Sequence, residues 1–368
     1  MHVRRPRFIL YTSACWLALH SGVWLLVVRR EPTRYPWPKD VRSMLEHWDA
    51  WHYSAIASKG YGGPVRWAFY PLYPLLVRAL AFVTGLRAHP EIVGTVFSTL
   101  AFAAYCVVQA RLAESPDGQM RALRPETAWG WLFFLCWPAS WVFHSHHTES
   151  LFLLLSFLAF FSARRGKWWA AALLAGLCAL ARNQGVFVAV AVALDGALRE
   201  RGLRRRALVF GASGAISFLL FACWPLYQCW AAGSPLMSVR AQWQFYPPIT
   251  SFYHYVGTIW FANSWQYKTW NLYLHHVVFV VLNGAGVLLW RRREFALAVY
   301  VLLSMWGPLS LGHLENAYRY GAVLFPALFL LGDGARRLPL TVRWALLGAL
   351  VCLNLACARD YALGAWAY

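Results

Sequence analysis

The strongest candidate for chemistry in this sequence of 368 residues is an acidic and aromatic segment near its N-terminus. His52 and Tyr53 follow Asp49 at helical spacing, so a short helix beginning at Asp49 would present all three side chains on one side. A carboxylate at a lipid–water boundary, flanked by rings and an imidazole, can act as a general base toward a hydroxyl nucleophile. The alternative is that Asp49 is a solvated loop residue or a helix cap.

Two arginines, Arg182 and Arg319, lie within or at the edge of apolar runs. A guanidinium group in a membrane is costly unless it faces a polar cavity or pairs with an anion. Its fork of donors also suits phosphate oxygens. Each arginine is therefore either a phosphate ligand or a structural residue that reaches the interface or pairs internally, as Arg319 would with Glu315.

Glu149 begins an apolar run and directly follows His144, His146 and His147. Ligands so close in sequence are compatible with zinc, but none of the usual ligand spacings is present. We therefore expect no metal and no other cofactor. From its position alone, Glu149 is also explained as a helix-terminal acid that the helix dipole stabilises.

Membrane-spanning helices must position these residues. The chain is 60% hydrophobic and 13% charged, and its apolar runs of roughly 15 to 22 residues have about the length that crosses a bilayer. We expect an all-α polytopic membrane protein, a single domain over residues 1–368 with about 11 or 12 transmembrane or re-entrant helices. The runs are 8–28, 69–86, 90–110, 126–143, 149–163, 168–181, 185–198, 207–230, 272–290, 295–312, 317–332 and 341–357.

The runs between 126 and 198 are short and closely joined, so they predict two hairpins whose tips stop inside the membrane. Arginine-rich connectors predict the cytoplasmic side, which leaves loops 29–68 and 231–271 outside. The first loop is the expected catalytic segment and the second an aromatic lid or interfacial segment. Runs 69–86 and 90–110 would invert the later topology if both crossed, so we expect that either one of them or one of the short hairpins does not span.

The formal charge is +19 with a pI near 10.0. In this sequence the arginines occupy short loops between apolar runs, which indicates membrane topology and attraction to lipid headgroups. No soluble segment combines a basic stripe with stacking aromatic residues, which argues against nucleic-acid binding. The 8 cysteines lie in or beside apolar runs, where thiols behave as small hydrophobic groups.

Four blocks of the sequence together resemble the PIG-V family. The first is Trp48-Asp49-Ala50-x-His52-Tyr53, continued by Ala68-Phe69-Tyr70-Pro71-Leu72-Tyr73-Pro74. The others are Pro138-Ala139-Ser140 with Thr148-Glu149-Ser150, then Ala181-Arg182-Asn183-Gln184-Gly185, and finally Tyr318-Arg319-Tyr320. They occur in the family's order over most of the chain, although Asn-Gln replaces the family's Ser-Asn after Arg182.

The resemblance implies a glycosyltransferase with the GT-C type of fold, related to GPI mannosyltransferase 2. It implies transfer of mannose from a polyprenyl or dolichyl-type phosphate on the non-cytoplasmic face, to a lipid-linked or glycan acceptor. The family's catalytic base corresponds to Asp49, and Glu149 would hold the acceptor or an arginine. The other implied substrate-binding residues are Trp48, His52, Tyr70, Tyr73, Arg182, Asn183, Tyr318 and Arg319.

The abundance of arginine and alanine predicts a GC-rich bacterial source, and therefore a plasma membrane with the active site on its outer face. A transporter or lipid flippase, with the embedded charged residues along its path, is the main alternative. It lacks the matching interrupted halves of inverted-repeat transporters. A non-catalytic partner subunit is a third possibility.

Overall fold

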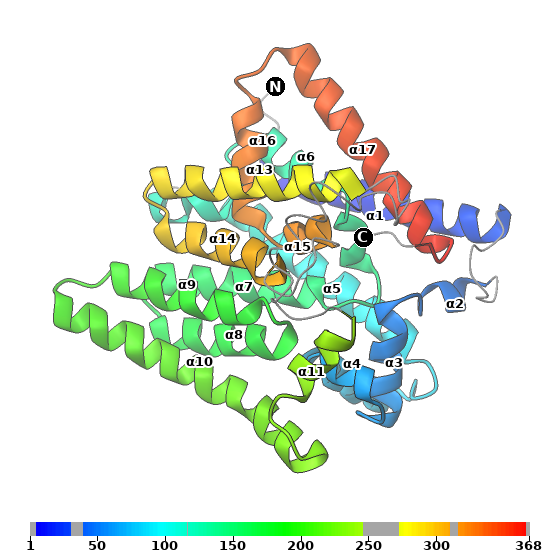
Figure 1. The fold of residues 1–368 in the computed structure, drawn as a ribbon. Helices are drawn as coiled ribbons and strands as arrows, with labels where there is room; N and C mark the ends of the chain where they lie inside the picture. Colours follow the sequence, from blue (N-terminus) through cyan, green and yellow to red (C-terminus); the bar gives the residue numbers. More distant parts are fainter. Residues whose placement is uncertain (1–4, 31–39, 116, 246–271, 310–315, 366–368) are drawn as a thin grey trace.

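The structure, a computed structural model, describes residues 5–30, 40–115, 117–245, 272–309 and 316–365. Within these ranges every regular element is a helix, which confirms the all-α prediction (Figure 1). Five helices are long and apolar enough to cross a membrane. They are α1 (Arg5–Arg30), α5 (Pro90–Leu112), α10 (Leu203–Ala232), α13 (Leu272–Arg291) and α17 (Leu340–Ala362).

Shorter apolar helices fill the space between the long ones. At 1.5 Å per residue, helices of 14 to 16 residues reach only about 21–24 Å, less than the roughly 30 Å of a bilayer core. The connectors at residues 145–148 and 181–185 are mostly buried, whereas those at residues 165–167 and 198–199 are exposed. One end of each hairpin therefore lies inside the protein. The shorter helices are α6 (Ala128–Leu135), α7 (Glu149–Arg164), α8 (Trp168–Ala181), α9 (Gly185–Leu198), α14 (Phe295–Leu309), α15 (Ala317–Ala322) and α16 (Phe325–Ala335).

The first polar loop contains helices of its own. Helix α3 begins at Asp49, as the spacing predicts, and its buried face includes Ala50, Tyr53 and Ile56. These buried residues recur at helical spacing and form an apolar stripe along α3. The helical elements here are α2 (Val41–Met44), α3 (Asp49–Lys59), η1 (Pro64–Ala68) and α4 (Leu72–Val83).

Helix α4 bears on the topology of this region. Its 12 residues extend about 18 Å, too short to cross a bilayer. It starts beside the N-terminal part of α5, where the Tyr73 hydroxyl donates to Gly94 O at 3.0 Å. Of the two runs 69–86 and 90–110, only the second thus forms a helix of spanning length, and the topology of this region stays a prediction.

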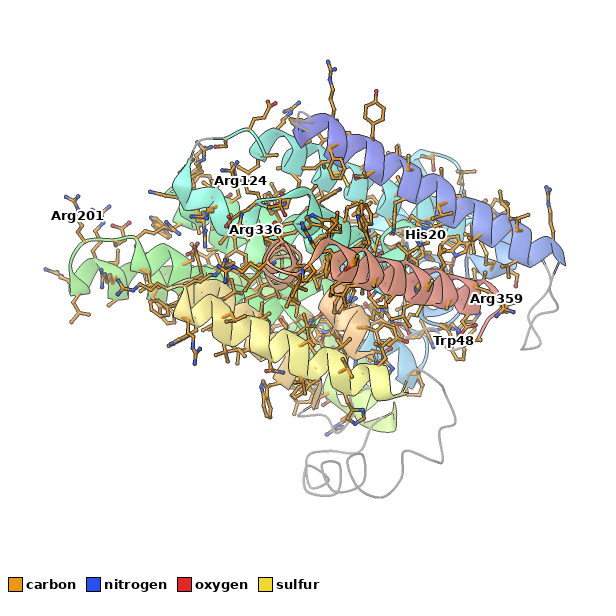
Figure 2. The ribbon with its side chains drawn as sticks, turned by 90° about the horizontal axis from the view of Figure 1, so that it is seen from above. His20, Trp48, Arg124, Arg201, Arg336 and Arg359 are labelled. Carbon is orange, nitrogen blue, oxygen red and sulfur yellow. The ribbon has the colours of Figure 1, made fainter. Side chains whose placement is uncertain are left out.

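The polar connectors gather at two opposite ends of the bundle. Figure 2 shows Arg124, Arg201 and Arg336 toward one end and Trp48 with Arg359 toward the other. At the first end, Arg164 contacts both Asp195, in the last turns of α9, and Glu294, which follows α13. The arginine-rich connectors thus share one end, as the predicted topology requires, and the first-loop helices occupy the other.

Part of the second polar loop packs on the first. Helix α11 (Met237–Phe245) lies against η1 (Figure 1), and the Gln242 side-chain amide donates to Ala68 O at 3.1 Å. The rest of the predicted lid, residues 246–271, lies outside the described residues.

Gly185, the first residue of α9, permits close approach between α8 and α9. A Cβ atom at this position would lie 2.1 Å from the backbone carbonyl group of Cys178. Gly185→Ala is expected to lower the free energy of unfolding by about 1–3 kcal/mol, because the backbone must shift. Thermal unfolding in detergent measures this loss. Gly348→Ala is the control, because a Cβ atom there meets nothing within 4 Å; an equal loss in both variants would contradict the prediction.

Candidate active site

The backbone at Trp48 turns the chain so that Asp49 starts α3. Trp48 has φ 57°, a conformation that is unusual for a residue other than glycine. Its indole nitrogen donates to Ala365 O at 3.0 Å, and this bond fixes the turn against the C-terminal segment. Asp49 thereby lies in the first turn of α3, where the helix dipole stabilises a negative charge.

Two hairpin tips, far apart in the sequence, meet near Asp49. The tip before α7 runs from Ser145 to Thr148 and is fully buried. The tip between α8 and α9 carries Arg182, whose Nη1 donates to Thr148 Oγ1 at 3.0 Å. Polar backbone and side chains are thus brought into the interior at one place.

Four charged side chains form a chain of ion pairs at these tips. Arg319 Nη1 lies 2.6 Å from Asp49 Oδ2, and Arg319 Nε lies 2.5 Å from Glu149 Oε1. Arg182 Nη1 pairs with the same oxygen of Glu149. The two arginines and the two carboxylates balance in charge, which is the compensation that buried ionised groups require. All four residues that we expected to share one site do so.

Access to solvent differs along this chain of ion pairs. The Asp49 side chain is 30% exposed, whereas those of Arg319 and Glu149 are 6% and 0% exposed. Asp49 is therefore the carboxylate that an entering ligand meets first. Glu149 Oε2 is buried and has no hydrogen-bond partner among the described residues, so this carboxylate retains an unused acceptor.

Charge interactions keep Asp49 ionised. Burial would raise its pKa, but the charge of Arg319 and the hydrogen bond that Arg319 donates hold the pKa below the usual 3.8. His147 is neutral, because burial and the nearby Arg319 lower its pKa to about 3. A neutral imidazole and an ionised carboxylate therefore face the same arginine.

The predicted residues around Asp49 lie at the mouth of the site. His52 stacks on Phe69 with ring centroids 4.6 Å apart, and burial lowers the pKa of its imidazole. Tyr70 is half-buried. The contact of His52, Tyr70 and Trp48 with substrate remains a prediction.

Three other predicted substrate contacts occupy different positions. Tyr73 is fully buried, and its hydroxyl bonds to Ser98 and His146. Tyr318 is also fully buried and stacks on His275. Asn183 is half-buried, and its side-chain oxygen accepts from the Gln184 backbone nitrogen at 2.8 Å. Tyr73 and Tyr318 thus support the site from within the core.

The three histidines before Glu149 diverge. His144 packs against Trp24 at 4.1 Å between ring centroids, and His146 bonds to Tyr73. In the part of the chain that the structure describes, no three His, Cys, Asp or Glu residues are placed to hold a metal ion.

Sequence reasoning missed three contributors to the site. Thr148 binds Arg182, His147 lies near Arg319 and Glu149, and the Tyr320 ring lies under the Arg182 guanidinium at 5.7 Å. Each is within two residues of a charged residue that was predicted, and that proximity was the available signal. The predicted alternative partner of Arg319, Glu315, lies outside the described residues.

The sequence was also compared with known protein families and proteins. The family model described as "Mannosyltransferase (PIG-V)" matches residues 35–246, more than half of the chain. The chain belongs to the PIG-V mannosyltransferase family. This match includes Asp49, Glu149 and Arg182 of the PIG-V family protein, whereas Arg319 lies beyond it.

Curated relatives agree with this assignment. The PIG-V family protein is 29% identical to GPI alpha-1,6-mannosyltransferase 2 of Mus musculus, over 39% of this chain and 29% of the relative. It is 30% identical to the protein of that name from Rattus norvegicus, over 39% of this chain and 30% of the relative. It therefore spans less than a third of the length of these relatives. No solved structure matches the chain.

Proposed function

We propose that this chain is a membrane mannosyltransferase that takes mannose from a polyprenyl-phosphate donor of the dolichyl type. The acceptor is the hydroxyl of a lipid-linked sugar or another glycan. The observation that carries this proposal is the partly exposed Asp49 carboxylate bound to Arg319, which connects it to Glu149 and Arg182.

In the proposed reaction, the acceptor oxygen attacks C1 of the mannose and the bond from C1 to the phosphate oxygen breaks. Asp49 takes the hydroxyl proton, and the polyprenyl phosphate leaves with the bonding electron pair. The anomeric centre inverts, because attack and departure are on opposite faces. Arg319 and Arg182 stabilise the negative charge of the departing phosphate.

The donor phosphate also prepares the base in this proposal. In the structure Arg319 lowers the pKa of Asp49, and a lowered pKa makes a carboxylate a weak base. A phosphate that binds Arg319 competes with Asp49 for the guanidinium group. Asp49 then loses part of its stabilisation when the acceptor hydroxyl arrives, and its pKa moves toward that of a better base.

The site is proposed to face the non-cytoplasmic side. The arginine-rich connectors lie at the opposite end of the bundle, and such connectors remain on the cytoplasmic side of membranes. An integral membrane protein in a bacterial plasma membrane fits this orientation. Cysteine labelling of Asp40→Cys and Arg201→Cys in intact cells tests it, since an impermeant reagent should label only the first.

The function is tested with purified protein, polyprenyl phosphate carrying labelled mannose, and a lipid extract of the host. The expected result is time-dependent transfer of label to an acceptor, with none from labelled GDP-mannose. Equal transfer from GDP-mannose would exclude the proposed donor. Flux of the labelled lipid across proteoliposomes without any transfer would favour the transporter.

A further inference from the structure

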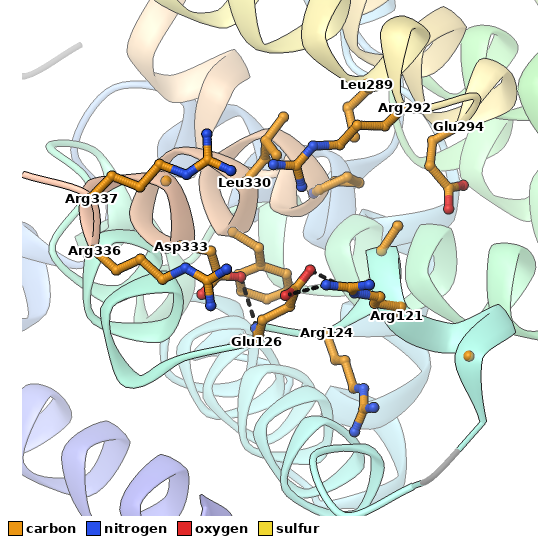
Figure 3. A pocket seen from close by; sticks show the side chains of 15 residues that line it. Arg121, Arg124, Glu126, Leu289, Arg292, Glu294, Leu330, Asp333, Arg336 and Arg337 are labelled. Carbon is orange, nitrogen blue, oxygen red and sulfur yellow. Dashed lines mark hydrogen bonds and ion pairs between the residues drawn. The ribbon is translucent and has the colours of Figure 1, made fainter.

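A cavity of about 420 Å³ lies at the end of the bundle opposite Asp49 (Figure 3). It is enclosed by η2 (Gly118–Leu123), the segment after it, and the ends of α13 and α16. This volume is within the range of about 300–1,000 Å³ that is usual for small-molecule sites. The reaction proposed above makes no use of it.

The charges that line this cavity are mostly positive. Five arginines and three carboxylates contribute to the lining. The Glu126 carboxylate already binds Arg121 through both oxygens, at 2.9 and 2.8 Å. Glu294 binds Arg164, a residue outside the lining, at 2.5 Å. The carboxylates are therefore occupied by partners of their own.

The third carboxylate, Asp333, is bound to the backbone. Its two oxygens accept from the backbone nitrogens of Glu126 and Thr127, both at 2.7 Å. The Thr127 hydroxyl donates to it as well, at 2.6 Å. Asp333 therefore joins α16 to the start of α6 and leaves little acceptor capacity for the arginines around it.

Arg124 donates to the backbone oxygens of Leu112 and Ala113, at 3.0 and 2.9 Å, so three guanidinium groups remain. The side chains of Arg292, Arg336 and Arg337 make no hydrogen bond or ion pair within the described residues. Figure 3 shows them reaching over the cavity from two sides, Arg292 from the end of α13 and the other two from the end of α16. Like charges so close together repel, and a bound anion would offset that repulsion.

The floor of the cavity is apolar. Leu289 and Phe329 are each 2% exposed and lie beneath the arginines. Arginines after a helix C-terminus also interact favourably with the helix dipole, which accounts for their position but not for a cavity between them. Guanidinium groups above an apolar floor fit a phosphate group that carries an apolar substituent.

We propose that this cavity binds a phosphate group through Arg292, Arg336 and Arg337. At a membrane surface such a group comes either from the headgroup of an anionic lipid or from a soluble phosphate. The site is separate from the one that contains Asp49, and it does not depend on the donor or acceptor of the transfer reaction.

Binding of fluorescent short-chain phosphatidylglycerol to the purified full chain in detergent tests the proposal, with phosphatidylcholine for comparison. The triple variant Arg292→Gln/Arg336→Gln/Arg337→Gln is expected to bind phosphatidylglycerol at least about tenfold more weakly. The matched control is Arg111→Gln/Arg201→Gln/Arg204→Gln, which removes the same charge from exposed positions outside the cavity and should bind like the wild type. Equal weakening in both variants overturns the proposal.

A second variant tests the cavity without removing charge. Gly334 lines it, and a Cβ atom there meets nothing within 4 Å. Gly334→Phe should fill the space and weaken binding although every arginine remains. Unchanged binding in this variant also overturns the proposal.

Inorganic phosphate distinguishes the two sources. If millimolar phosphate displaces labelled phosphatidylglycerol from the wild type, the site accepts soluble phosphate. Binding of labelled phosphatidylcholine, the comparison lipid, should not change when phosphate is added. If only anionic lipid displaces the label, the lipid headgroup is the ligand. Both results support a phosphate site, and displacement by phosphatidylcholine at equal concentration contradicts it.

Discussion

Asp49→Asn is expected to lower kcat for mannosyl transfer by about 100- to 10,000-fold, the usual contribution of a general base. Asparagine keeps the size of the side chain and an oxygen that can accept from Arg319, but it cannot take the proton of the acceptor hydroxyl. Substrate binding should change much less, so KM for the labelled donor should stay within a few-fold. Initial rates at saturating donor and acceptor measure both constants.

Asp40→Asn is the matched control for this variant. Asp40 lies in the same loop and caps α2 through a 2.7 Å bond to the Ser43 backbone nitrogen, a role that asparagine also fills. It should therefore retain full activity. Undiminished transfer by Asp49→Asn would rule out Asp49 as the base, and a similar loss in both variants would indicate a general effect on the loop.

Arg319→Gln is expected to lower kcat by about 100- to 1,000-fold, as does the removal of one donor that stabilises developing negative charge. The fold should survive the substitution, because Glu149 keeps its ion pair with Arg182. Arg87→Gln is the control, since Arg87 is exposed and stacks only on Phe82. If Arg319→Gln is as active as this control, Arg319 has no part in the transfer.

Arg319→Gln should also change how kcat/KM depends on pH. Burial raises the pKa of Asp49 and Arg319 lowers it, so removal of Arg319 lets the pKa rise. The base is active when ionised, so activity is lost as the pH falls through that pKa. In the wild type the loss should therefore occur at lower pH than in Arg319→Gln. A profile of kcat/KM against pH measures the shift, and identical acid limbs would show that Arg319 does not control Asp49.

Local spacing predicted the parts of the site that depend on neighbouring residues. Asp49, His52 and Tyr53 are separated by helical intervals, and α3 begins at Asp49. Arg182 was predicted because a charged group within an apolar run needs a partner, and Glu149 because the resemblance to the PIG-V family implied a role for it. The sequence left open which partner each one has, since pairs such as Arg319 with Asp49 join residues 270 positions apart.

The lengths of the apolar runs were a weaker guide. Run 69–86 has the composition of a membrane helix, but Thr84 and Gly85 end α4 after 12 residues. The resemblance to the PIG-V family implied that Tyr73 and Tyr318 bind substrate, and both are fully buried. Motif position specifies proximity to a site but not the direction of a side chain, which packing decides.

The sequence by itself determined that this protein is an all-α membrane protein, because long apolar runs without water must form helices. It also indicated, through the resemblance to the PIG-V family, the charged residues that we propose for transfer. Only the tertiary structure decided that two hairpin tips and the first-loop helix meet, so that Arg319 contacts Asp49 and Glu149 together. The physical reason is that buried charges must be compensated, and their partners come from whichever segments the packing of the bundle brings together.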